Sequence, residues 1–242
     1  MVRDLVVFGG DVAAGPMPVE TIEVLAGYGG RARFLRGNAD RFMVEIFDGD
    51  RAAGEASDAW PANLLSRDQR DFLSSFEPVV EVDVDGLGWV LCCHAGPASD
   101  EAPIITPATP DEVIAKTLAS TEASLVVAGH THTQFDRRVA SRRMVNAGSV
   151  GMPYADQPGA YWVLLGPEVD LRRTAYDLKG RPRRSAGPTS PPARSWLEVS
   201  SDHRRPTRRS PCSSAWPAGR AERRLLERRA LAHTREGCRP AV

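Results

Sequence analysis

Short apolar segments that end in polar or turn residues recur along the first part of the chain. The run DLVVFGGDV, at 4–12, is rich in β-branched residues and ends in Gly-Gly-Asp. A second run, ARFLRGNAD at 32–40, leads into a Gly-Asn pair. Short apolar runs that close on turn residues are typical of buried strands in a parallel sheet. We therefore expect both segments to be strands.

Segments with apolar residues at helical spacing lie between and after these runs. The first spans 19–30 and ends in a pair of glycines, which often stop a helix. Helices are also expected around 43–47 and over 66–76, the latter with a serine N-cap. A further helix is predicted with Thr109 as N-cap and Pro110 in its first turn.

The remaining pattern predicts strands. The segments 79–86 and 88–96 form a hairpin-like pair around a glycine-rich turn. Further short strands are predicted at 125–128, 135–139, 143–146, 161–165 and 169–176. Strands that alternate with helices and then continue as antiparallel pairs predict an α/β sandwich built on a mixed sheet. Trp89 and Trp162 are expected in its core.

The composition changes after Leu178. Residues 179–242 are rich in Arg, Pro and Ser, and 181–242 hold fifteen arginines against five acidic residues. That segment carries a balance of +10 and the rest of the chain a balance of −10. We expect a domain over 1–178 and a disordered tail over 179–242. The acidic balance of the domain argues against nucleic acid as its partner, and a nucleic-acid-binding arm in the tail is a separate alternative.

Cysteine content and hydropathy bear on the compartment. The four cysteines are too scattered for a disulfide framework, and the adjacent Cys92 and Cys93 are expected to be inert core thiols. No apolar run approaches the roughly 20 residues of a membrane span, and no early segment reads as a signal peptide. The expectation is a soluble cytoplasmic protein without a membrane partner.

Possible metal ligands follow the apolar runs. Asp11, Asn38 and His94 each follow one predicted strand, and His130 and His132 follow another. Ligands of open α/β sheets gather at the carboxyl ends of strands, and carboxylate, amide oxygen and imidazole together suit divalent transition ions. Each feature alone is more typical of a turn or of a structural histidine. Their order along the chain, each closing an apolar run, is what favours a metal site.

These motifs resemble the calcineurin-like metallophosphoesterases, specifically their small single-domain bacterial and archaeal phosphodiesterase-like branch. The resemblance covers about 2–178 and rests on VVFGGDVAAGPMP, RFLRGNADR, LCCHAGP, VVAGHTHTQFDRR and VNAGSVGMP. It implies a four-layer α/β/β/α sandwich. It also implies hydrolysis of a small phosphate ester, in particular a phosphodiester, by a metal-bound hydroxide at a site for two divalent ions of the Mn, Fe, Zn or Ni type.

The same resemblance assigns roles to the candidate ligands. Asp11 matches the aspartate that bridges the two ions. Asn38, His94 and His130 match the residues that complete one ion, and His132 matches a ligand of the other. No side chain is assigned to catalysis beyond the metal-bound water.

Two departures from the family pattern change the prediction. Ala39 stands where many members have a histidine that protonates the leaving group, while Asp40 is retained and is expected to support the ligands or the turn. The Asp-x-His motif that completes the second ion in the family has no match before Asp11. We therefore expect the first strand and helix of the domain to be missing and the second ion site to be incomplete.

Two further hypotheses concern the ends of the chain, the first from the missing motif and the second from the Arg-rich composition of the tail. The start of the chain is misplaced, and the residues beyond about Lys179 are read in a shifted frame; a genuine basic tail is the alternative. For function, the alternative to an active phosphoesterase is a catalytically impaired remnant that binds at most one metal or a phosphate.

Overall fold

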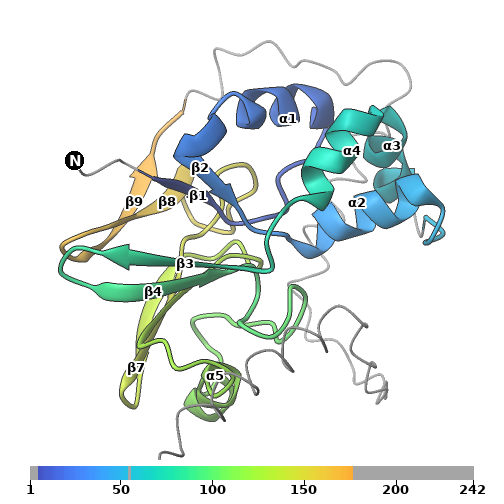
Figure 1. The fold of residues 1–242 in the computed structure, drawn as a ribbon. Coiled ribbons are helices and arrows are strands. Elements are labelled where there is room, and N and C mark those ends of the chain that lie inside the picture. Colours follow the sequence, from blue (N-terminus) through green and yellow to red (C-terminus); the bar gives the residue numbers. More distant parts are fainter. Residues whose placement is uncertain (1–4, 54–55, 177–242) are drawn as a thin grey trace, which may run out of the picture. The chain divides into compact units, whose positions relative to one another are not determined.

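The structure is a computed structural model that describes residues 5–53 and 56–176 (Figure 1). The predicted tail over 179–242 lies outside these residues. The described strands are β1 (Val6–Phe8), β2 (Ala32–Phe34), β3 (Val79–Val84), β4 (Gly88–Cys93), β5 (Leu125–Ala128), β6 (Phe135–Val139), β7 (Arg142–Asn146), β8 (Ala160–Leu165) and β9 (Val169–Thr174). They confirm the predicted strands, with ends shifted by a few residues.

The strands form a mixed sheet and two smaller pairs. The five-stranded sheet has the order β3-β4-β5-β7-β6, in which β4, β5 and β7 run parallel, whereas β3 and β6 pair antiparallel at its edges. β1 pairs in parallel with β2, and β8 with β9 in a hairpin. Because β4 and β5 run in the same direction, their carboxyl ends lie at the same end of the sheet. The segments that follow them therefore leave the sheet side by side. A hydrogen bond joins these two segments, because the Gly129 N–H donates to the carbonyl of His94 (2.8 Å).

The described helices are α1 (Pro18–Ala26), α2 (Asn38–Asp48), α3 (Ala56–Leu64), α4 (Arg67–Ser74) and α5 (Asp111–Leu118), with a 3₁₀ turn at Gly29–Arg31. Ser66 caps α4 as predicted, since its hydroxyl accepts a hydrogen bond from the Gln69 N–H. In return, the Ser66 N–H donates to the side-chain oxygen of Gln69. The predicted cap of α5 is wrong by one residue. Pro110 takes the N-cap position, and the Thr109 hydroxyl instead accepts from the Thr106 N–H.

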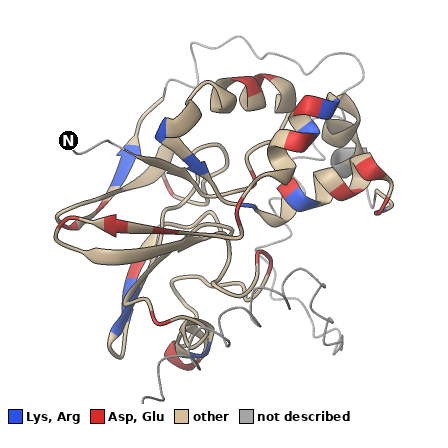
Figure 2. Cartoon of the chain, in the orientation of Figure 1, with Lys and Arg blue, Asp and Glu red and all other residues tan. Residues whose placement is uncertain are grey.

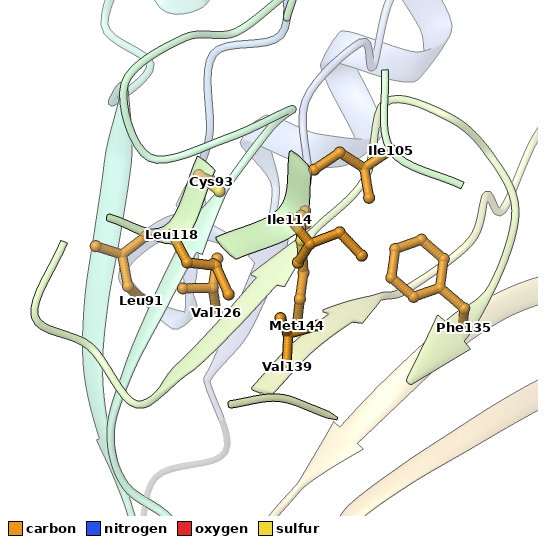
Figure 3. Packing of buried hydrophobic residues seen from close by; sticks show 10 residues of the cluster. Leu91, Cys93, Ile105, Ile114, Leu118, Val126, Phe135, Val139 and Met144 are labelled. Atoms are coloured by element: carbon orange, nitrogen blue, oxygen red, sulfur yellow. The ribbon is translucent and has the colours of Figure 1, made fainter. Parts of the chain in front are cut away.

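Three apolar clusters stack the elements into layers. The first lies between α5 and one face of the five-stranded sheet, where Ile114 and Leu118 meet Val126 and Met144 (Figure 3). The second, which includes Leu35, lies between the opposite face of this sheet and the strand pairs β1–β2 and β8–β9. The third joins α1, α2, α3 and α4 to β2. The order helix, sheet, sheet, helix is the predicted α/β/β/α sandwich.

The distribution of charged side chains differs between the strand and helix layers. The strand β4 carries no charge, whereas α2 and α4 carry both signs (Figure 2). Arg70 on α4 pairs with Asp48 on α2, and Arg41 on α2 pairs in bidentate fashion with Asp100 (2.9 and 3.1 Å). No described helix combines the length and the apolar character that crossing a bilayer requires.

Two predictions about single residues have opposite outcomes. Cys92 and Cys93 are both buried, on opposite faces of β4, and burial raises the pKa of the Cys92 thiol to about 11, as befits an inert core thiol. Trp89, predicted in the core, is 66% exposed. It lies near the start of β4, one residue after the hairpin turn, where no layer formed by the described residues covers it.

Candidate metal centre

Three of the predicted ligands converge at the edge where the parallel strands end. Single donor atoms of Asp11, His94 and His130 all lie within 4.8 Å of one another. The His94 Nε2 atom is 3.2 Å from Asp11 Oδ2 and 3.2 Å from His130 Nδ1. These residues come from three different loops, after β1, β4 and β5.

The spacing of these atoms suits a shared ion. Donors bound at about 2.1 Å to one ion are separated by about 3.0 Å in octahedral and 3.4 Å in tetrahedral geometry. The two distances of 3.2 Å fall between these values. One carboxylate and two imidazoles are ligands that Mn²⁺, Fe²⁺, Zn²⁺ and Ni²⁺ accept.

A backbone contact sets which nitrogen of His94 faces the cluster. The His94 Nδ1 atom lies 2.6 Å from the carbonyl oxygen of Gly9. A carbonyl only accepts, so Nδ1 carries the proton, and Nε2 is the ring atom that points to Asp11 and His130. Metal-binding histidines commonly donate their second ring nitrogen to a backbone carbonyl in this way.

Asn38 carries a buried acceptor on the segment that binds Asp11. It is the first residue of α2, and its side-chain oxygen is buried and accepts no hydrogen bond. Buried polar oxygens are nearly always paired, because an unmade bond costs about 1–3 kcal/mol. A cation at this position would satisfy the oxygen.

The next residue, Ala39, donates its N–H to Asp11 Oδ1 (2.8 Å), so the Asp11 carboxylate also caps the N-terminus of α2.

Asp40 ties together the two loops that carry Asp11 and Asn38. It is fully buried and accepts three backbone hydrogen bonds, from Asp11 (2.7 Å), Val12 (3.0 Å) and Gly37 (2.9 Å). Because these donors lie on different loops, the side chain holds the loops at a fixed separation. The supporting role expected for Asp40 stays a prediction, and these contacts are the structural basis on which it can be tested.

The backbone at the centre is held in an uncommon conformation. Four described residues other than glycine have clearly positive φ angles, and three of them are Asp11 (56°), His130 (64°) and His132 (55°). Left-handed backbone is unfavourable for residues with a side chain, and it concentrates at functional sites.

His132 lies beside the cluster of three but is not part of it. Its carbonyl accepts from the Tyr154 N–H (3.0 Å), and its ring lies 5.3 Å from the Tyr154 ring. Among the described residues, Asp11, His94 and His130 form the one group of at least three carboxylate, imidazole or thiol side chains with this spacing. The prediction that His132 helps to hold a second ion stays a prediction.

The acidic and basic groups of the cluster shift one another's pKa. Burial raises the pKa of Asp11, but the hydrogen bond and the charge of His94 outweigh burial and lower it. Burial lowers the pKa of His94, and Asp11 reverses this and raises it. Burial and the charge of Asp11 raise the pKa of Asp40 to about 7, against the three N–H donors, which lower it.

Comparisons with known proteins establish the family of the chain. The profile of the calcineurin-like phosphoesterase superfamily domain matches residues 1–166. The chain belongs to this superfamily. No curated protein matches it.

Solved structures of similar proteins share the fold. A hypothetical protein from Pyrococcus horikoshii OT3 is 18% identical with a TM-score of 0.63, and the match covers 73% of this chain and 77% of that one. A metallophosphoesterase from Sphaerobacter thermophilus is 20% identical with a TM-score of 0.54, and the match covers 72% and 78%. At this identity the likeness establishes the calcineurin-like fold and does not specify a substrate.

The sequence analysis did not single out two glycines, Gly10 and Gly37, that allow the loops of the candidate centre to pack closely. A Cβ atom on Gly37 would overlap the Asp11 side chain and backbone, and one on Gly10 would lie 2.6 Å from His94 Nδ1. Gly10 also has a φ of 91°, which favours glycine. The position of Gly37 directly before Asn38 was the available signal, because close backbone approach often needs glycine.

Proposed function

We propose that the protein is a divalent-metal-dependent phosphoesterase that hydrolyses phosphate esters, and phosphodiesters in particular. The observation that carries the proposal is the convergence of Asp11, His94 and His130. The buried oxygen of Asn38 supports it, because the next residue, Ala39, binds Asp11 through its N–H. These four residues would hold one ion. Asp11 and His132 would contribute to a second.

Different residues of the chain would have different roles at such a site. Divalent ions in phosphoesterases activate water and neutralise charge on the phosphoryl group. Asp11 stays ionised because His94 lowers its pKa and the Ala39 N–H binds it. His94 keeps its Nε2 atom toward the cluster through Gly9. The N-terminus of α2, which begins at Asn38, favours an anion at the same place.

The side chain at Ala39 limits the substrates. A methyl group cannot donate a proton to a departing alkoxide, and no catalytic acid is proposed at this position. The chain should therefore act best on esters whose leaving group has a low pKa and needs no proton, such as a nitrophenolate.

A second candidate function is binding of one metal or of phosphate without turnover. The observation that favours it is that a single group of three ligands converges among the described residues. The two candidates differ in turnover and agree on metal binding.

Hydrolysis of bis(p-nitrophenyl) phosphate by the full chain with added Mn²⁺ tests the proposal. We expect turnover that chelation abolishes, and at least a hundredfold loss in the His94→Ala variant, as for removal of a central catalytic element. Asp83→Asn, which changes an exposed carboxylate on β3, is the control and should keep full activity. Metal binding without turnover would instead support the binding-only function.

A further inference from the structure

The two sides of the candidate centre have different surroundings. On the side of His94 and Asn38, charged groups neutralise one another. Arg41 binds Asp100, Glu45 and Glu101, and the Arg36 guanidinium lies 3.6 Å from Asp100.

The side of His130 and His132 carries exposed apolar residues instead. Two segments flank the loop from His130 to His132. Ile105 accepts a hydrogen bond from the Thr131 hydroxyl (2.8 Å), and the Tyr154 N–H binds the carbonyl of His132. Three apolar side chains close to these anchor residues in the sequence are exposed: Ile104 (52% exposed), Val150 (63%) and Met152 (41%).

The segment with Val150 and Met152 is fixed on both sides. The Gly148 N–H binds the Asn146 side chain (2.9 Å), the Tyr161 N–H binds the Ser149 carbonyl (3.0 Å), and the Met152 N–H binds the Ser149 hydroxyl (3.0 Å). Asn146 in turn donates to Gly129 and to Thr131. The apolar side chains are therefore presented by an ordered loop, which limits the entropy lost when they bind a group.

Single exposed apolar residues need no explanation, but a group of them beside a site often binds a ligand. We propose that Ile104, Val150 and Met152 form a subsite for an apolar substituent of the phosphate ester, on the His130–His132 side of the centre. This inference rests on the proposed function, because the phosphoryl group must sit at the metal cluster. It names the substrate class as esters with an apolar, in particular aryl, substituent.

Binding of two phosphonates to the Mn²⁺-loaded full chain by isothermal titration calorimetry tests the subsite. Phenylphosphonate and methylphosphonate share the phosphoryl group and differ in apolar area. We expect the phenyl compound to bind about tenfold more tightly, and this preference to fall to about twofold in the double variant Val150→Ser with Met152→Ser. The affinity for methylphosphonate should not change.

Matched variants separate a local effect from a general one. Val24→Ser removes an exposed apolar side chain from α1 (66% exposed) and should keep the phenyl preference, as should Val150→Leu with Met152→Leu. Equal affinity of the wild-type chain for both phosphonates, or an unchanged preference in the serine double variant, would overturn the subsite and leave the proposed function standing. Failure of the Mn²⁺-loaded chain to bind either phosphonate would overturn both.

Discussion

Asp40 lies behind the candidate ligands and binds the backbone of the two loops that carry them. Replacing it with alanine removes all three acceptors and leaves the N–H groups of Asp11, Val12 and Gly37 without a partner in a buried place. We expect Asp40→Ala to lower the free energy of unfolding by about 3 kcal/mol or more. It should also weaken Mn²⁺ binding by about 10–100-fold.

Urea denaturation and titration calorimetry measure the two effects of this change. Asp136→Ala is the control, because Asp136 pairs with Arg143 on the neighbouring strand at a partly exposed position. Its loss should cost about 1 kcal/mol or less and leave Mn²⁺ affinity unchanged. Equal effects of the two substitutions would contradict the supporting role of Asp40.

Gly37 gives a second test at the scale of one residue. Its φ of −83° suits any residue, so the need for glycine comes from space alone. A Cβ atom would overlap Asp11, and the loop before α2 would have to move away. Gly37→Ala should therefore lower Mn²⁺ affinity at least about tenfold.

The control for this change is Gly15→Ala, because a Cβ atom at Gly15 meets nothing within 4 Å. It should alter stability by about 0.5 kcal/mol or less and leave metal binding intact. Unchanged Mn²⁺ affinity in Gly37→Ala would show that the loop tolerates the shift and that close packing here is unnecessary.

At the scale of elements, the pair of Arg41 and Asp100 joins α2 to the segment that follows His94. Burial raises the pKa of Asp100, but the hydrogen bonds of Arg41 and its charge lower it overall. A lowered carboxyl pKa stabilises the fold above the unfolded value of about 3.9, and this contribution is lost as the pH falls below it. The ionised pair therefore couples two ligand-bearing segments at neutral pH.

Asp100→Asn should lower the free energy of unfolding by about 1–3 kcal/mol at pH 7. The difference from the wild-type chain should begin to shrink as the pH falls through about 3.9, where the unfolded carboxyl takes up a proton. It should be lost once the pH falls below the lowered pKa of the folded carboxyl. Denaturation at several pH values measures this, with Asp170→Asn as an exposed control. A difference that stays constant with pH would mean that the charge of Asp100 does not matter.

At the scale of the whole molecule, stability depends on the contact between the two sheet layers. Leu35 is 2% exposed and lies in the cluster that joins these layers, two residues before Gly37. Leu35→Ala should cost about 2–5 kcal/mol, because it leaves a cavity between the sheets. Leu164→Ala, at a 39% exposed position on β8, should cost about 1 kcal/mol or less in the same denaturation experiment. Similar losses for both would contradict the layered arrangement.

Much of this architecture could be predicted because β1, β4 and β5 are short apolar runs. The runs before Asp11, His94 and His130 predicted both the strands and the edge at which these residues meet. The start of α2 at Asn38 was not predicted, since Gly-Asn is typical of a turn. α3 was missed because it has little helical periodicity and contains Pro61.

The contacts that connect distant segments were beyond prediction from local pattern. The bonds of Asp40 to Asp11 and Val12 span 29 and 28 residues, and the contact of Tyr154 with His132 depends on how the loop before β8 folds back. These arise from packing in three dimensions. Local patterns therefore identified the candidate ligands, and the structure shows which contacts hold and surround them.

The most direct test of the metal centre is the number and affinity of Mn²⁺ ions bound by the full chain, measured by titration calorimetry on the wild type and on Asn38→Ala. We predict at least one tightly bound ion in the wild type. We also predict affinity at least about tenfold weaker in the variant, because the Asn38 oxygen is then absent. No bound ion in the wild type, or identical binding in both, would contradict the assignment of Asp11, Asn38, His94 and His130 as a metal site.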